Sequence, residues 1–271
     1  MNPEPRITPL PATGAHIVTI DGEPPLLRLR TGRHTALDSP PSALHDELAA
    51  ERDADPDDAD SSGYLARLTL EVQERERADE EHRWPAARRD VGLVGEGVLA
   101  EEIARVLEGW GARVARTASA ATAQAAAALI VSVADGADER RDRAVLDDLL
   151  DQGVARLRVY REGECVFVDP LATETADATA AHVSRRRIAA GTAPGALEAW
   201  HGFGPASDHP LDSPTVALVT ARVLTMALAW AQGDATLPRL RTTLWKLVPA
   251  LGLVTEHPVI AYPTPHPRAS R

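Results

Sequence analysis

A glycine-rich turn between two apolar segments is the feature that most constrains the fold of this 271-residue chain. Residues 91–100 read Val-Gly-Leu-Val-Gly-Glu-Gly-Val-Leu-Ala, and a helix-forming run, 101–109, follows them. This order predicts a buried strand, a tight turn and a helix N-terminus. Gly95 permits the tight turn, Gly97 lets backbone approach a phosphate, and Ala100 permits close packing of helix on strand. The chain is therefore predicted to contain an α/β domain of the dinucleotide-binding type.

Strand and helix patterns alternate after this turn, which is typical of an α/β sheet with helices on both faces. The right-handed crossover rule predicts that the first four strands are parallel. A segment rich in Gly, Pro and His, 191–213, is expected to be a loop, and the chain from Glu256 onward is expected to be extended. The expected strands are 91–94, 112–116, 128–134, 157–161, 165–168 and 240–248, and the expected helices are 98–109, 119–127, 138–153, 176–190 and 214–230.

The first ninety residues follow a different pattern. Short alternating or β-branched runs at 16–20, 26–30 and 33–37 predict a small antiparallel meander. Helical patterns follow at 43–52 and at 63–81, and the second is purely polar beyond Val72. The Trp-Pro segment at 84–85 suggests a boundary. We predict two domains: a small α+β module, 1–88, and a Rossmann-like α/β domain, 89–271.

Composition excludes several classes of function. The formal net charge is −11 and aromatic residues make up 4% of the chain, which argues against nonspecific nucleic-acid binding. Cys165 is the one cysteine, so neither an internal disulfide nor a cysteine zinc site is expected. The first residues lack the apolar core of a signal peptide, and polar residues interrupt the longest apolar run, 216–231. A cytoplasmic protein with no membrane segment is expected.

Groups that would support catalysis are scarce. The strand after the glycine-rich turn ends without the acid that would hold a ribose, and Lys246 is the only lysine. The nine histidines show no metal-binding spacing, so no metal ligand and no catalytic residue is assigned. Asp135 follows a predicted strand and is either a turn former or a ligand-facing acid. Nucleotide binding at Gly95, Gly97 and Ala100 stays open as an alternative.

Two further features have competing interpretations. Ser184 to Arg187 form a basic cluster on a predicted helix, either a solvated face or a site for an acidic partner. Cys165 lies in a predicted strand and is expected to be a buried, inert thiol.

The first domain offers a non-catalytic site. A short sheet beside an amphipathic helix leaves a strand edge and a groove, to which an extended peptide can add as a further strand. The alternative is that the apolar residues are only the core of that domain. The candidate groove residues are Leu27, Leu29, His34, Thr35, Leu65, Leu68 and Val72.

The order of these segments resembles a known family. The α/β domain opens on the 91–97 turn, continues through the segment 162–171, and ends on Pro263-Thr-Pro-His-Pro-Arg268. This order is similar to the ThiF-like, leader-peptide-binding proteins of bacteriocin and thiazole/oxazole-modified peptide biosynthesis, whose N-terminal part is a PqqD-like, winged-helix-like recognition element. The resemblance implies binding of the leader of a ribosomal precursor peptide, as an added strand beside the third helix of that element. It also implies delivery of the core peptide to a YcaO-type cyclodehydratase or another modifying enzyme.

The chain departs from that family pattern in two respects. Members often hold zinc with two Cys-x-x-Cys pairs, whereas residues 172–182 and 266–271 contain no cysteine, so zinc is not expected. Adenylating members use a lysine, an arginine and an acid around ATP, and the single late Lys246 does not fit that set.

The preferred hypothesis is therefore a non-catalytic scaffold, without a required cofactor, that binds a leader peptide, docks to a modifying enzyme and forms a homodimer as such folds often do. The alternatives are an NAD(P)- or ATP-dependent Rossmann enzyme and a structural α/β protein.

Overall fold

The computed structural model describes residues 5–20, 22–38, 40–41, 44, 59–122 and 127–262, and side chains at 59–62 and 121 are not described. The chain divides into two compact units, Met1–His82 and Arg83–Arg271. This division lies a few residues before the boundary predicted at 88/89. The helix predicted at 43–52 falls largely outside the described residues.

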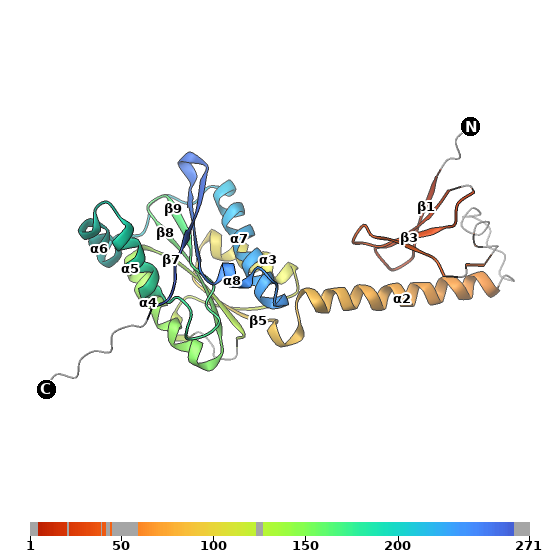
Figure 1. Ribbon diagram of the computed structural model, residues 1–271, viewed down its shortest axis with the longest axis horizontal. Helices are drawn as coiled ribbons and strands as arrows, with labels where there is room; N and C mark the ends of the chain where they lie inside the picture. Colours follow the sequence, from red (N-terminus) through yellow and green to blue (C-terminus); the bar gives the residue numbers. More distant parts are fainter. Residues whose placement is uncertain are drawn as a thin grey trace. The chain divides into compact units, whose positions relative to one another are not determined.

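The first unit is a four-stranded antiparallel meander packed on one long helix (Figure 1). Its strands are β1 (Arg6–Pro9), β2 (His16–Thr19), β3 (Leu26–Arg28) and β4 (His34–Ala36), in the order β1-β2-β3-β4. The three strands predicted from the sequence are present. The β1 strand was not predicted, because its one large apolar residue, Ile7, is 62% exposed and gives no alternating signal.

The helix α2 (Ala59–Arg83) supplies the second layer of this unit. Tyr64, Leu68 and Val72 are buried, and they pack with Ile17 and Leu27 of the sheet. The polar second half of the helix remains regular, and polar contacts fix it to the meander. Gly14 N donates a hydrogen bond to Glu76 Oε1 at 3.0 Å, and Arg30 Nη1 lies 3.1 Å from Glu80 Oε1.

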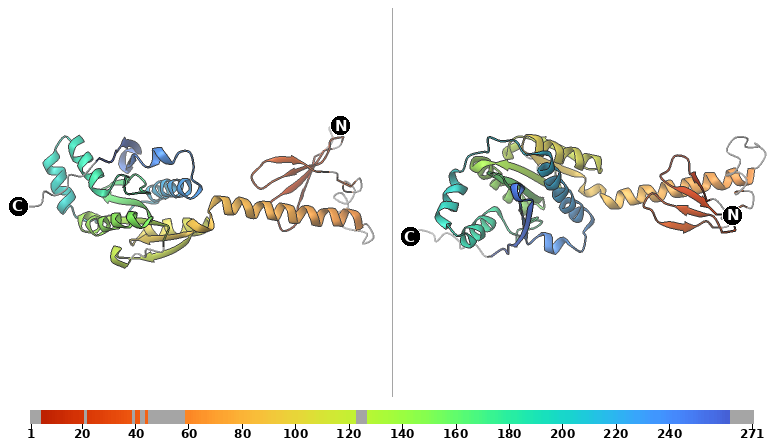
Figure 2. Two further views of the ribbon diagram at one scale, coloured as in Figure 1. Left: turned by 60° about the horizontal axis from the view of Figure 1, so that its bottom comes forward. Right: turned by 90° about the horizontal axis from the view of Figure 1, so that it is seen from above.

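The second unit is a seven-stranded mixed sheet covered by helices on both faces (Figures 1 and 2). Its order is β11-β10-β9-β8-β7-β5-β6. The four strands β6, β5, β7 and β8 are parallel, as predicted, and β9, β10 and β11 extend the sheet in antiparallel pairs. The predicted α/β class with helices on both faces is therefore confirmed. The strands are β5 (Asp90–Val94), β6 (Arg113–Thr117), β7 (Leu129–Asp135), β8 (Ala155–Glu162), β9 (Cys165–Val168), β10 (Thr243–Val248) and β11 (Leu253–Pro258).

The helices divide between the two faces of this sheet. The helices α3 and α7 pack against each other on one face, while α4, α5 and α6 lie on the other (Figure 1). The α helices are α3 (Val98–Gly109), α4 (Gly136–Ala144), α5 (Ala180–Ala190), α6 (Pro194–Phe203), α7 (Ser213–Gln232) and α8 (Leu237–Leu240), and the 3-10 segments are η1 (Ala86–Arg88), η2 (Ala120–Thr122), η3 (Val145–Gln152) and η4 (Pro249–Leu251).

Several predicted elements were wrong in detail. The segment 191–213 is not a continuous loop, because Pro194 at the first turn starts the helix α6. The helix predicted at 138–153 changes to 3-10 geometry at Val145, which places Leu146 and Leu150 in the core. The strand predicted at 240–248 begins only at Thr243, since Leu240 ends the short helix α8.

The helix α7 is long and apolar enough to cross a membrane by length and composition. In this fold 56% of its most apolar window is buried inside the unit. Val219, Val223 and Met226 are fully buried and pack with Ile103 and Leu107 of α3. Burial against a neighbouring helix and the sheet accounts for the apolar sequence of α7.

Candidate functional site

A groove of about 330 Å³ runs between the strand β4 and the helix α2 of the first unit. Its floor is apolar and includes the buried side chains of Leu27, Leu29 and Leu37. On the helix side, Tyr64, Leu68 and Val72 of α2 complete the groove. The hydroxyl of Tyr64 donates a 3.1 Å hydrogen bond to the carbonyl of Asp38, which ties the second turn of α2 to the segment that follows β4.

Five of the seven predicted groove residues line this cavity: Leu27, Leu29, Thr35, Leu68 and Val72. The other two lie elsewhere. His34 is exposed on β4 and pairs with Arg28 of β3, on the solvent face of the sheet, while Leu65 packs, partly buried, against the module core. The strand period explains the difference, because neighbours on a strand point to opposite faces. The prediction assigned both His34 and Thr35 to the groove, although neighbouring residues of a strand face opposite sides.

Among the residues that the structure describes, β4 is one of the two edges of the four-stranded sheet, and β1 is the other. An edge strand presents a row of backbone N–H and C=O groups that a further strand can pair with. Thr35 shares the face of its paired residue Leu27 and is half-buried beside the groove. Backbone pairing groups and an apolar cleft therefore occur side by side, which is the arrangement that strand addition requires.

The rim of the groove carries charges from successive turns of α2. Arg67, Glu71 and Arg75 are exposed and line the cavity at spacings of four residues. The guanidinium of Arg67 also lies 5.4 Å from the centroid of the Tyr64 ring. A peptide in the groove would meet two positive groups and one negative group along the helix.

The glycine-rich turn forms a separate cavity of about 330 Å³ in the second unit. Gly95 has φ +136°, and a Cβ there would approach the carbonyl oxygen of Val133 to 2.7 Å, so only glycine fits. Gly97 and Ala100 also line the cavity, as predicted for a phosphate turn. The lining includes two carboxylates, however, at Glu96 and Glu101.

The arginine nearest to this turn is already engaged. Arg116 Nη2 lies 3.0 Å from Glu108 Oε1, at the far end of α3. A phosphate in the turn would therefore meet two negative side chains and one guanidinium, that of Arg116, in an exposed ion pair. The backbone geometry suits an anion, but the charges around it do not.

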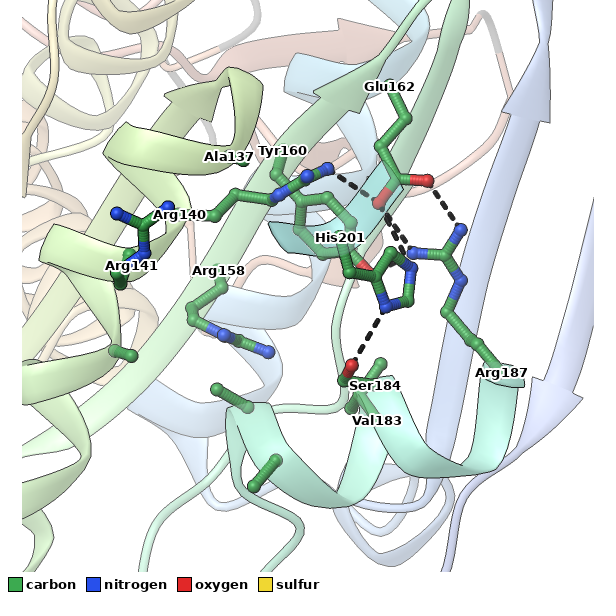
Figure 3. A pocket seen from close by; sticks show the side chains of 13 residues that line it. Ala137, Arg140, Arg141, Arg158, Tyr160, Glu162, Val183, Ser184, Arg187 and His201 are labelled. Carbon is green, nitrogen blue, oxygen red and sulfur yellow. Dashed lines mark hydrogen bonds and ion pairs between the residues drawn. The ribbon is translucent and has the colours of Figure 1, made fainter. Parts of the chain in front are cut away.

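A third cavity, of about 280 Å³, lies against the α4, α5 and α6 face of the sheet (Figure 3). Sequence analysis did not predict it. The strand β8 alternates the apolar residues Ala155, Leu157 and Val159 with Arg156, Arg158 and Tyr160 and ends on Arg161 and Glu162; the even-numbered residues point to this face. A buried strand in a parallel sheet, covered by helices on both faces, is normally apolar on both faces. The polar residues on one face of β8 were therefore the sequence signal that could have indicated a charged site.

The centre of the third cavity is the carboxylate of Glu162. Arg140 Nη1 donates to Glu162 Oε1 at 2.6 Å, and Arg187 donates to Oε1 at 2.8 Å and to Oε2 at 2.6 Å. These guanidiniums, together with His201, oppose burial and leave the pKa of Glu162 lowered. Arg187 and Ser184 belong to the basic cluster 184–187, which was predicted as either a solvated face or a site for an acidic partner. Both line this cavity and have hydrogen-bond partners in it.

His201 lies beside this carboxylate. Its Nδ1 is 2.8 Å from Ser184 Oγ, and its Nε2 is 3.5 Å from Glu162 Oε1 (Figure 3). Burial, followed by the positive charge of Arg187, lowers the pKa of His201 to about 4. The imidazole is therefore neutral in the folded protein near neutral pH.

We expect this histidine to make the second unit less stable as the pH falls. Its folded pKa lies below the unfolded value of 6.5, so between about pH 6.5 and 4 the unfolded state binds a proton that the folded state does not. Urea unfolding should show a larger loss of stability from pH 7 to pH 5 for the wild type than for His201→Gln. Equal losses in the two proteins would contradict this reading. Glu162 loses its own contribution at lower pH, below its unfolded value of 4.5.

Asp135, predicted as either a turn former or a ligand-facing acid, has a structural role. Asp135 Oδ1 accepts a hydrogen bond of 3.1 Å from Ser207 N and so anchors the segment after α6. Burial raises the pKa of this carboxyl.

Cys165 is half-buried, not fully buried as expected, because β9 begins there at the turn. Among the described residues, no group of three or more His, Cys, Asp or Glu side chains is placed to hold a metal ion.

Comparisons with known proteins find relatives by structure alone. No protein-family model matches this sequence, and no curated protein sequence matches it. Among solved structures, a chain of the E. coli microcin synthetase McbBCD complex with pro-MccB17 bound matches with a TM-score of 0.52 and 9% identity, over 96% of each chain. A heterocyclase in complex with substrate and cofactor matches with a TM-score of 0.51 and 13% identity, over 96% of this chain.

Both matches extend over both units of this chain. The chain spans 38% of the length of the heterocyclase, so it corresponds to a part of that protein. At these identities the comparisons show a shared fold. The predicted resemblance is confirmed as a fold shared with these two structures.

Proposed function

We propose that this protein binds the leader segment of a ribosomal precursor peptide in the groove between β4 and α2, and presents the core of that peptide to a modifying enzyme. In this proposal the chain itself is a cytoplasmic, non-catalytic scaffold. The observation that supports it most is the apolar groove beside β4, an edge strand of the described part of the sheet, lined by five of the seven residues predicted for it.

The chemistry of the groove fits an extended peptide. Alternate side chains of an added strand would point to the same face, toward Leu27, Leu29 and Leu68, while its backbone pairs with β4. Main-chain hydrogen bonds would provide affinity with little dependence on sequence, and the apolar floor would select the inward-facing residues. A leader with apolar residues at every second position and an acidic residue near Arg67 or Arg75 matches this lining.

The shared fold supports the choice of peptide and partner. One similar structure is a component of a complex with pro-MccB17 bound, and another is a heterocyclase with substrate and cofactor bound. A partner enzyme of the cyclodehydratase class, docking to the second unit, is proposed by analogy with these assemblies. A nucleotide-dependent activity at the glycine-rich turn is disfavoured by Glu96 and Glu101 in its lining.

Filling the groove should weaken leader binding while the fold is kept. Thr35 is half-buried and points toward the groove, so Thr35→Trp places an indole where the inward-facing peptide side chains would lie. We expect the Kd for the leader to rise at least about tenfold, or about 1.4 kcal/mol. The measurement is a fluorescence-anisotropy titration of the full chain against a labelled leader peptide. The peptide is taken from a precursor encoded next to the gene of this protein.

The matched control is Thr8→Trp on the opposite edge strand. Thr8 is also half-buried, and it pairs with the core residue Ile17 as Thr35 pairs with Leu27. The proposal predicts unchanged affinity for this variant. Loss of binding in Thr8→Trp but not in Thr35→Trp would place the peptide on β1, and unchanged binding in both would refute strand addition at either edge.

A further inference from the structure

The third cavity has the composition of a ligand site rather than of a structural core. Four guanidinium groups line it, from Arg140 and Arg141 on α4, Arg158 on β8 and Arg187 on α5. The chain as a whole carries a formal net charge of −11, so a local concentration of positive charge is not expected from its composition. Positive charge collected in a partly enclosed cavity attracts anions more strongly than the same charge on an open surface.

The ion pairs among the described residues leave positive charge uncompensated. Glu162 is one carboxylate shared by two guanidiniums, those of Arg140 and Arg187. Arg141 is 64% exposed at its side chain, and its partner Asp138 is 95% exposed, so that pair is weak in water. The cavity therefore has a surplus positive charge. The Arg141 guanidinium near its mouth also donates from Nη2 to the carbonyl oxygen of Gly202 at 2.9 Å, and its Nε and Nη1 groups carry the donors offered to a ligand.

Donor atoms in and beside the cavity also lack partners. Arg158 pairs through Nη2 with Asp169, but its buried Nε has no hydrogen-bond partner in the described structure. His201 Nε2 is likewise buried and without a hydrogen bond, 3.5 Å from Glu162. Buried polar groups left unpaired are costly, so they commonly mark the place of a missing partner.

We propose that this cavity binds the phosphoryl group of a small molecule. Arg141 and Arg187 would hold its oxygens by charge-assisted hydrogen bonds. A volume of about 280 Å³ accommodates a phosphate with a small organic group attached. A neighbouring cavity of about 380 Å³ shares Arg187 and adds Arg186 and the only lysine, Lys246, beside the apolar side chains of Phe167 and Leu244.

Acyl transfer by the same side chains is less consistent with the geometry. The order Ser184, His201, Glu162 matches a nucleophile, a base and a carboxylate. Glu162, however, already accepts three hydrogen bonds from two guanidiniums. A histidine with a pKa of about 4 is also far too weak a base to activate a hydroxyl near neutral pH. The cluster is better suited to holding an anion than to transferring a proton.

The test is calorimetric titration of the full chain with inorganic phosphate and with pyrophosphate, at constant ionic strength in chloride, with acetate as a carboxylate comparison. Saturable binding of phosphate or pyrophosphate, and none of acetate, is expected. Arg141→Gln at the mouth should weaken binding several-fold without disturbing the buried pairs. Arg185→Gln, an exposed residue of α5 outside the cavity lining, is the matched control and should bind as the wild type does.

Glu162→Gln provides the opposite change. It removes the carboxylate that competes with the ligand for Arg140 and Arg187, so phosphate affinity should rise in a variant whose circular dichroism is unchanged. The proposal is overturned if the wild type shows no saturable binding, if acetate binds equally well, or if Arg141→Gln and Arg185→Gln behave alike. The leader titration is independent of all these outcomes, because its residues belong to the other unit.

Discussion

Replacing Asp169 by leucine is expected to lower the free energy of unfolding of the second unit by about 3–5 kcal/mol. Asp169 and Arg158 form an ion pair in which the two side chains are 2% and 10% exposed. Burial alone would lower the pKa of Arg158, but Asp169 and Asp147 reverse this and raise it. The variant leaves a guanidinium in the interior without its carboxylate. Urea unfolding followed by circular dichroism measures the loss.

Two variants separate this effect from simple loss of a side chain. The double variant Arg158→Met, Asp169→Leu removes both charges, and it should recover most of the lost stability, because an apolar pair of similar volume replaces a buried ion pair at little cost. Asp138→Asn breaks the exposed pair with Arg141 and should change stability by less than about 0.5 kcal/mol. A double variant as unstable as Asp169→Leu would contradict the electrostatic explanation.

Leu68→Asp is expected to abolish leader binding and to destabilise the first unit by several kcal/mol. Leu68 is 9% exposed, lines the groove and packs in the core of that unit. A carboxylate there is removed from water beside apolar neighbours, and it also places a charge where the peptide's apolar side chains would lie. The measurements are leader titration by anisotropy and thermal unfolding of the full chain.

The control lies two residues along the same helix. Leu70 is 66% exposed and is outside the groove lining, so Leu70→Asp makes the same chemical change in water. We expect near-wild-type stability and affinity for it. Since Leu68→Asp affects folding as well as binding, Thr35→Trp remains the sharper test of the groove itself. Equal affinities for the Leu68→Asp and Leu70→Asp proteins would contradict the assignment of Leu68 to the site.

The fold could be predicted where local pattern and tertiary packing agree. The turn at Gly95 and the helix Val98–Gly109 follow from residues close in sequence, and the structure confirms both. The helix α6 was missed because a segment rich in glycine and proline carries a weak helical signal, and none of its residues is buried to create an apolar face. Its start depends on Pro194 at the first turn, a local cue that the composition of the segment obscured.

The two candidate sites differ in how far the sequence predicts them. The groove could be predicted because its leucines recur at strand and helix spacings, and these repeat patterns identify a shared face. The charged cavity could not, since Glu162, Arg187 and His201 are brought together by three elements whose packing no local pattern specifies. The polar alternation of β8 showed that one face was charged, but not which arginines on other elements would meet it.

The central claim is that an extended peptide pairs with β4 beside α2. Amide hydrogen exchange of the full chain, with and without the leader peptide, tests it most directly. The account predicts added protection at β4, residues His34–Ala36, and along the groove-facing turns of α2 from Tyr64 to Arg75, with the glycine-rich turn unchanged. Protection confined to β1, or to the turn around Gly95 and Gly97, would contradict it.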